Sequence, residues 1–263
     1  MERKKVAISQ SLMKDLQAYF QGEECGLVIK GNYIDDVEMY SSDAMKLGQY
    51  FEYVATGQLP RNKQIPEPEV VYKGKPNEKL SSAYEKAHAS AMFAKTLFTT
   101  MGIEILATGE KLAYEDAIGT LDIRANWNGR KAIIDLKYTG LLDNKWDDRG
   151  WSFDTLENKD KLLIQAVHYK YICENHFGED YDFYFFLFSS TDPMDVRIAK
   201  IEVDHVRTLT HIEDIKKAKQ IWANMVENNT FKAKGSLLKC SKCALKDNCK
   251  EIVLLPTVKT IHY

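Results

Sequence analysis

Two strand-like segments joined by an Asn-Gly pair constrain the fold of this chain more than any other feature. Residues 117–127 and 131–138 are rich in aliphatic and aromatic side chains and contain no proline. Asn128 and Gly129 follow the first segment, and both tolerate the positive φ that a tight hairpin turn requires. The sequence therefore predicts an antiparallel β-hairpin.

Further strands and helices are predicted on either side of this hairpin. Segment 57–76 contains four of the six prolines, which favours a connecting loop. Helices that flank a contiguous group of strands predict an α/β fold with a mixed central β-sheet. The other strands are expected at residues 103–106, 183–188 and 196–203, and the helices at 9–20, 43–56, 81–101, 156–175 and 204–228.

The composition excludes some classes of protein. With 44% hydrophobic and 28% charged residues, the chain does not have the composition of a mostly disordered protein. A formal net charge of -2 gives no overall positive field, so nucleic-acid binding would depend on local basic patches and metal ions. No apolar stretch of about 18 residues could cross a membrane. We expect a cytoplasmic protein, with no membrane partner and with reduced cysteines.

Two acidic residues and a lysine lie on the predicted hairpin. Asp122 is on its first strand, and Asp135 and Lys137 share one face of the second strand because they are two residues apart. The hairpin brings Asp122 near Asp135. Carboxylates bind Mg²⁺ or Mn²⁺, which can polarise a phosphate and lower the pKa of a bound water. A nearby lysine can orient that water or offset charge, so the group suits phosphodiester hydrolysis.

The triplet Asp-x-Lys is not specific by itself. It recurs at residues 143–145 and 214–216, and a solvated surface pair is the ordinary interpretation of such a triplet. The triplet at 135–137 differs from these because it ends an apolar strand. It also pairs with Gly119-x-x-Asp122 across the predicted turn.

Gly119-x-x-Asp122 followed by Ile-Asp-Leu-Lys at 134–137 resembles the PD-(D/E)XK nuclease superfamily. The resemblance implies a restriction-endonuclease-like core at about residues 43–203 of a single nuclease domain, 1–263. It also implies that Asp122, Asp135 and the carbonyl of Leu136 bind the metal ion, and that Lys137 is catalytic.

Two more elements resemble one branch of that superfamily. Gln165-Ala-x-x-Tyr169 is similar to an element of the RecB nuclease domain, of AddB and of the CRISPR-associated RecB-like exonucleases. There the two side chains lie beside the active site; a core tyrosine and a surface glutamine are the alternative. Residues 48–52 resemble an early Gly-x-x-x-His/Glu element, which implies Glu52 as the third side-chain ligand; a surface helix residue is the alternative. His88 is a candidate substitute ligand, although an ordinary helix histidine is the simpler interpretation.

Three cysteines near the C-terminus have the spacing of a metal site. Cys240, Cys243 and Cys249 form a C-x2-C-x5-C pattern, whereas a tetrahedral zinc or iron–sulfur site needs four ligands. Cys25 and Cys173 are the candidates for the fourth. Cys173 lies within a predicted helix and suits a small buried core residue.

The same resemblance favours Cys25 over Cys173 as the fourth ligand. Residues 8–12 through 24–26 resemble the opening of the CRISPR-associated and AddB-type nucleases, in which a helix leads to a lone cysteine. This implies a [4Fe–4S] cluster at Cys25, Cys240, Cys243 and Cys249, in a clasp formed by residues 9–30 and 229–255. Gly26 departs from the family, which often has proline there. Zn²⁺ is the alternative, because spacing alone does not separate the two metals.

Basic residues near these cysteines are candidates for DNA binding. Residues 231–250 contain six lysines and one acid, so they could contact the phosphate backbone or simply form a solvated tail. Arg149 lies in a polar loop at 143–154, whose Trp146, Trp151 and Phe153 could stack on unpaired bases or pack on the core. The candidates for phosphate contacts are Lys239, Lys242, Lys246 and Arg149.

These observations predict a metal-dependent DNA nuclease. An exonuclease that acts on DNA ends or single strands, in recombination, repair or CRISPR adaptation, is the expected activity. DNA is the expected partner, beside proteins of recombination, replication or CRISPR adaptation. A non-catalytic DNA-binding protein with the same fold and a zinc-stabilised interaction module are the alternatives. Cleavage polarity and oligomeric state do not follow from the sequence.

Overall fold

The structure is a computed structural model that divides into two compact units. Residues 42–213 form one unit, and residues 1–41 with 214–263 form the other. Within the described residues, no helix is long and apolar enough to cross a membrane. The structure describes residues 7–37, 41–60, 63–140, 142, 146–147, 150–151, 156–234, 237–241, 243–247 and 249–250.

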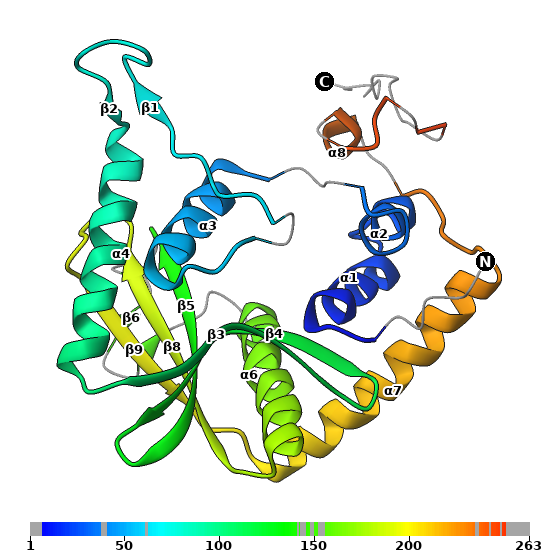
Figure 1. Ribbon diagram of the computed structural model, residues 1–263. Helices are drawn as coiled ribbons and strands as arrows, with labels where there is room; N and C mark the ends of the chain where they lie inside the picture. Colours follow the sequence, from blue (N-terminus) through cyan, green and yellow to red (C-terminus); the bar gives the residue numbers. More distant parts are fainter. Residues whose placement is uncertain are drawn as a thin grey trace, which may run out of the picture. The chain divides into compact units, whose positions relative to one another are not determined.

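A five-stranded mixed sheet organises the unit 42–213 (Figure 1). Its strands are β3 (Glu104–Tyr114), β4 (Ala117–Trp127), β5 (Arg130–Thr139), β8 (Tyr181–Ser189) and β9 (Val196–Ile201), in the order β3-β4-β5-β8-β9. Strands β5 and β8 are parallel, and the other neighbours are antiparallel. The predicted fold class, a mixed sheet flanked by helices, is confirmed.

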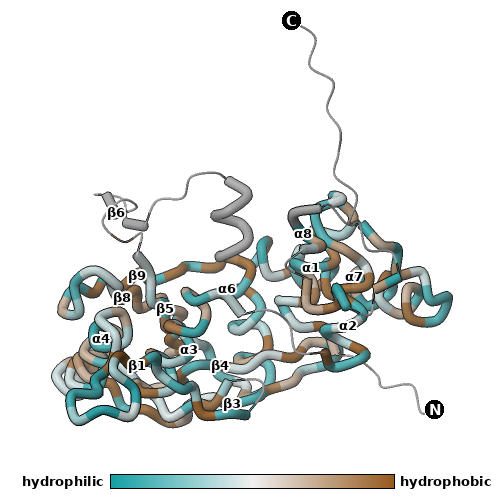
Figure 2. The backbone as a smooth tube through the Cα atoms, turned by 90° about the horizontal axis from the view of Figure 1, so that it is seen from above, coloured by the Kyte–Doolittle hydropathy of each residue, from teal (hydrophilic) through white to brown (hydrophobic). Residues whose placement is uncertain are grey.

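The turn between β4 and β5 has the predicted geometry. Asn128 and Gly129 have φ values of 53° and 74°, which these two residue types accommodate at little cost. Residues 132–136 of β5 are all buried, as expected for an inner strand that is covered on both faces. Figure 2 shows the corresponding hydrophobic segments along β5 and β8.

Helices cover the two faces of this sheet. Helices α3 (Asp43–Thr56) and α4 (Ser82–Thr100) pack on one face, where Phe51 and Phe98 join a core with Ile134 and Phe186. Helix α6 (Leu156–Phe177) contacts β3, β4 and β8 from the other face (Figure 1). Residues that alternate along β5 therefore point either to α3 and α4 or to α6.

Some elements differ from the sequence prediction. Strand β1 (Val70–Val71) lies within the predicted loop 57–76 and pairs with β2 (Lys79–Leu80), which follows that loop. Strands of two residues show no periodicity in the sequence. The same holds for β6 (Trp146–Asp147) and β7 (Gly150–Trp151). Strand β3 continues eight residues past its predicted end at 106, to Tyr114, because an exposed edge strand needs little apolar sequence.

The other unit contains α1 (Gln10–Gln21), α2 (Gly26–Tyr33) and α8 (Leu237–Ser241). It also includes the part of α7 (His205–Glu227) from residue 214 onward. The predicted cap of α1 is present, since the Ser9 hydroxyl accepts a hydrogen bond from the Leu12 N–H at 3.2 Å. Trp222 packs between Tyr33 and Phe231 and so joins the two chain segments of this unit.

Gly26 connects the same two segments through the backbone. Its N–H donates to the carbonyl of Lys232 at 3.0 Å, and a Cβ at this position would lie 2.8 Å from that carbonyl oxygen. A proline, which the resembled family often has here, would lose the hydrogen bond and fill occupied space. The departure from the family pattern thus has a structural reason.

Candidate active site

Three carboxylates and one lysine from three elements meet in the unit 42–213. Glu52 comes from α3, Asp122 from β4, and Asp135 and Lys137 from β5. They lie close enough that their charges shift the pKa values of Glu52, Asp122 and Lys137. Phe51 stacks on Tyr138 of β5 with ring centroids 5.0 Å apart, and this contact holds the neighbouring Glu52 against the strand.

Asp122 lies where the pairing of β4 and β5 stops. The last pair of the ladder is Ile123 with Ile134, and one more step would place Asp122 opposite Asp135. Instead, the Leu136 N–H donates to Asp122 Oδ2 at 2.8 Å. The strands separate at this point, and the Asp122 carboxylate takes the place of a backbone acceptor.

Asp135 is held by two side chains. It is 1% exposed, its Oδ2 contacts the ammonium of Lys137, and its Oδ1 accepts a hydrogen bond from Gln165 Nε2 of α6. Lys137 Nζ also lies 5.5 Å from the centre of the Phe185 ring. One oxygen of the Asp135 carboxylate is therefore held by Lys137 of the same strand and the other by Gln165 of α6.

Gly119 of one sequence element lies against Tyr169 of the other. Tyr169 is buried and forms a hydrogen bond with Gln165. A Cβ at Gly119 would lie 2.9 Å from the Cε1 atom of Tyr169, so only glycine lets the ring approach β4 this closely. Tyr169 is thus a core residue that also fixes Gln165, and Gln165 is buried rather than a surface glutamine.

Burial and mutual repulsion raise the pKa values of the carboxylates. Burial raises the pKa of Glu52 to about 7, with Asp135 adding to the effect and Lys137 opposing it. The pKa of Asp122 is raised for the same reason, first by burial and then by Asp135 and Glu52. For Lys137 burial lowers the pKa, but the three carboxylates together outweigh burial and raise it. The lysine therefore stays an ammonium ion.

The excess negative charge fits a divalent cation. One buried and two half-buried carboxylates face a single ammonium group. The raised pKa values of Glu52 and Asp122 show that their charged forms lack compensation. Glu52, Asp122, Asp135 and the Leu136 carbonyl offer hard oxygen ligands of the kind that Mg²⁺ and Mn²⁺ prefer. The side chains therefore suit such an ion by charge and by chemistry.

The carboxylates are not arranged as a closed ligand group. Among the described residues, no three His, Cys, Asp or Glu side chains lie as a metal site would hold them. The oxygens of Asp135 face Lys137 and Gln165, and Asp122 Oδ2 faces the Leu136 N–H. The metal-ligand roles assigned from the sequence stay predictions.

Two histidines that the sequence did not point to form a buried pair, and the His168 ring lies next to that of Tyr169 with centroids 6.2 Å apart. His168 Nε2 lies 3.0 Å from the carbonyl oxygen of Ile118, and His168 Nδ1 lies 2.9 Å from His211 Nε2. Because a carbonyl only accepts, His168 Nε2 carries the hydrogen and His211 Nε2 donates to His168 Nδ1. This pair ties α6 to β4, and isolated helical histidines give no sequence signal for it. His88 instead lies 3.2 Å from the Tyr50 hydroxyl and is exposed.

The four cysteines of the predicted cluster belong to the other unit. All four are free and half-buried. Backbone N–H groups lie 3.4 Å from the sulfur atoms of Cys25 and Cys243, but these contacts do not complete a metal-holding group among the described residues. Cys173 is fully buried in α6, within the unit 42–213. The cluster itself stays a prediction.

The candidates for phosphate contacts are only partly described. Arg149 and Lys242 lie outside the described residues, as does Phe153. Lys239 is exposed and its ammonium contacts the carbonyl of Glu23, and Lys246 is exposed. The structure therefore places two of these four basic residues on a surface.

Comparison with known proteins shows a shared fold. No family model matches this chain, and no curated protein matches it. A crystal structure from Eubacterium rectale, of a protein provisionally named an exonuclease, has a TM-score of 0.65 and 18% identity, covering 97% of this chain and 91% of that one. A phage-related exonuclease from Haemophilus somnus 129PT has a TM-score of 0.40 and 14% identity, covering 71% of this chain and 84% of that one. The first likeness shows that the chain has the fold of the Eubacterium rectale protein.

Proposed function

We propose that this chain is a DNA nuclease that depends on Mg²⁺ or Mn²⁺. The observation that carries the proposal is the buried Asp135, which Lys137 and Gln165 hold beside Asp122 and Glu52. The sequence elements of the PD-(D/E)XK superfamily and its RecB and AddB branch support it, and so does the shared fold. Within that class we propose an exonuclease for DNA ends or single strands, acting in recombination, repair or CRISPR adaptation.

The residues of the site have separate roles in this proposal. Glu52, Asp122, Asp135 and the Leu136 carbonyl would hold the ion, which when bound polarises the phosphate and lowers the pKa of a coordinated water. Lys137 keeps its positive charge because of its carboxylate neighbours. It therefore orients the attacking water and offsets negative charge on the phosphate.

Gln165 and Tyr169 act through Asp135. Gln165 donates to one oxygen of Asp135 and Tyr169 holds Gln165, so the carboxylate cannot rotate freely. A fixed ligand lowers the cost of organising the site when substrate binds. In this role the two residues position the metal-binding strand.

We also propose a structural cluster in the other unit. A [4Fe–4S] cluster at Cys25, Cys240, Cys243 and Cys249 would join the N- and C-terminal segments as a clasp, with Zn²⁺ as the alternative occupant. The backbone N–H groups near Cys25 and Cys243 support thiolate ligands, because such contacts stabilise negative charge on sulfur.

A cleavage assay tests the proposed activity. Pure protein with Mg²⁺ or Mn²⁺ should degrade labelled single- or double-stranded DNA, EDTA should stop the reaction, and Asp135→Asn or Lys137→Ala should lower the rate by roughly 100-fold or more. Asp214→Asn and Lys216→Ala are matched controls, because they alter a second triplet with the Asp-x-Lys pattern, which lies on α7. Activity equal to wild type in the Asp135 and Lys137 variants would refute the assignment.

A further inference from the structure

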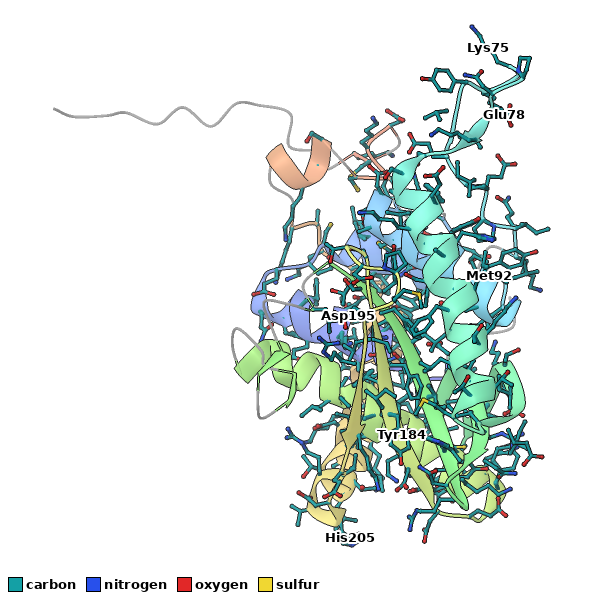
Figure 3. The ribbon with its side chains drawn as sticks, turned by 90° about the vertical axis from the view of Figure 1, so that its left-hand side faces the viewer. Lys75, Glu78, Met92, Tyr184, Asp195 and His205 are labelled. Atoms are coloured by element: carbon teal, nitrogen blue, oxygen red, sulfur yellow. The ribbon has the colours of Figure 1, made fainter. Side chains whose placement is uncertain are left out.

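The β1–β2 hairpin is an ordered projection with an exposed tip. All eight residues from 72 to 79 are exposed, yet backbone hydrogen bonds organise the loop, from Lys75 N–H to Tyr72 O at 3.0 Å and from Glu78 N–H to Lys75 O at 2.9 Å. Figure 1 shows the hairpin extending beyond the N-terminal end of α4, and Figure 3 labels Lys75 and Glu78 at its tip. A loop that served only to connect α3 and α4 would not need this extension.

The hairpin carries an excess of positive charge. Lys73, Lys75 and Lys79 are exposed against one acid, Glu78. Glu78 turns inward, where its Oε2 accepts a hydrogen bond from the Gly74 N–H at 2.5 Å. None of the three ammonium groups forms an ion pair with another of the described residues. The lysines are therefore available to an anionic partner.

Tyr72 is unusual in both its backbone and its exposure. Its φ is 57°, in the left-handed region that glycine and asparagine adopt readily but that a bulky side chain adopts at a cost. The side chain is also 57% exposed, so burial does not repay that cost. A tyrosine at a turn position that suits glycine, with Lys73 directly after it, indicates a role in binding.

We propose that the β1–β2 hairpin binds single-stranded DNA. Lys73, Lys75 and Lys79 contact successive phosphates, and Tyr72 stacks on an unpaired base. An exposed aromatic ring favours unpaired bases, because bases within a duplex already stack on each other. The role of this binding rests on the proposed nuclease function, because single-stranded DNA would then be the part of the substrate that the hairpin holds. The binding itself can be measured without cleavage.

The place of the hairpin suits this role. It belongs to the same unit as Asp135 and Lys137. Along the chain it connects α3, which carries Glu52, to α4. In Figure 1 the arrow of β5 points toward the end of the unit from which the hairpin projects. A DNA strand bound by the β1–β2 hairpin is thus held at the end of the unit toward which β5, the strand with Asp135 and Lys137, runs.

Binding measured without cleavage tests the proposal. The probe is a fluorescent single-stranded oligothymidylate in EDTA, with anisotropy as the readout. Replacement of all three lysines by alanine should weaken binding and reduce the slope of log affinity against log salt by about 2, at about 0.7 per phosphate contact. Triple replacement of Lys86, Lys95 and Lys111, which are exposed in the same unit, is the matched control and should leave the slope unchanged.

Variants of Tyr72 separate stacking from folding. Tyr72→Ala should weaken binding roughly tenfold, whereas Tyr72→Trp should bind at least as tightly as wild type, because every base can stack on an indole. Tyr72→Gly should bind like Tyr72→Ala but melt no lower than wild type, since glycine adopts the left-handed conformation without strain. A loss of binding that followed a loss of folded protein would contradict the proposal.

The outcomes also separate this proposal from the nuclease function. Wild-type affinity and salt slope in the hairpin variants would overturn the hairpin proposal, even if wild type cleaves DNA and Asp135→Asn does not. Weakened binding by the hairpin variants would support it, even if wild type shows no cleavage under any condition. Selective loss of duplex binding in the hairpin variants would also overturn the assignment to single strands.

Discussion

The carboxylate of Asp122 accepts a hydrogen bond from the backbone N–H of Leu136 at 2.8 Å, at the point where β4 and β5 stop pairing. A backbone carbonyl would ordinarily occupy this position in the ladder. The substitution of a carboxylate for a carbonyl places negative charge beside Asp135 inside the sheet. The point at which the β4–β5 hairpin stops pairing therefore sets how close the charges of Asp122 and Asp135 lie in the candidate active site.

Asp122→Asn should stabilise the metal-free protein while removing its activity. The pKa of Asp122 is raised by burial, Asp135 and Glu52, so the charged form opposes folding near neutral pH. Asparagine keeps an acceptor for the Leu136 N–H and removes the charge. Urea unfolding in EDTA should show a gain of about 1 kcal/mol or more. A clear loss of stability in EDTA would contradict this electrostatic account.

Gly119→Ala should be destabilising and should also impair cleavage. The new Cβ would lie 2.9 Å from the Tyr169 ring, so the ring and α6 must move, and Gln165 with them. We expect a loss of about 1–3 kcal/mol in unfolding free energy and slower cleavage by the folded variant. Gly48→Ala is the control, because nothing lies within 4 Å of its added Cβ and alanine favours the α3 helix. Equal stability of the two variants would refute the close-approach argument.

The buried histidine pair should destabilise the protein on acidification, with a sign opposite to that of Glu52 and Asp122, whose raised pKa values favour the folded state as they take up protons. Burial lowers the pKa of His168 to about 4, and burial and then His168 lower that of His211 to about 3. Since the usual value is 6.5, their contribution is complete above about pH 6.5 and is lost as the pH falls through these values. The contribution of the pair to the unfolding free energy should fall by up to about 1.4 kcal/mol per pH unit for each proton that the unfolded chain takes up.

Denaturant unfolding at a series of pH values, with a variant as reference, checks this contribution. A His168→Gln variant lacks the ionisable ring, so its stability should depend less steeply on pH between about 6.5 and about 4. If the two proteins showed the same slope over that range, the histidine pair would not be the source of the acid sensitivity.

Much of the sheet could be predicted from local sequence. The Asn-Gly turn and the apolar run before Asp135 were sufficient to predict β4 and β5, and the structure has β4 at the predicted bounds. Helix α3 also has its predicted bounds, with Ser42 as its cap. The short strands β1, β2, β6 and β7 could not be predicted, because their pairing depends on tertiary context rather than on periodicity.

The neighbourhood of Asp122 and Asp135 followed from the hairpin, but the contacts around them did not. That Gln165 donates to Asp135 and that Tyr169 packs on Gly119 depends on how α6 docks on the sheet. The bond between His168 and His211 joins residues that are 43 positions apart. Such contacts require the relative placement of whole elements, which a single sequence does not contain.

The four cysteines should retain iron as a group. Protein purified without oxygen should contain about four iron atoms per chain, and Cys25→Ser or Cys240→Ser should release them and lower the melting temperature. Cys173→Ala is the control, since this thiol is buried in α6 in the unit 42–213, and it should leave the iron content unchanged. Stoichiometric zinc in place of iron would overturn the cluster and support the zinc alternative.

Calorimetric titration with Mn²⁺ tests most directly whether the carboxylates of α3, β4 and β5 form a cation site. We expect wild type to bind Mn²⁺ at neutral pH, and Asp122→Asn and Asp135→Asn to lose that binding while remaining folded. Asp214→Asn, which alters an Asp-x-Lys triplet outside the site, should bind as wild type does. Equal binding by wild type and the Asp135 variant, or no binding by folded wild type, would contradict the account.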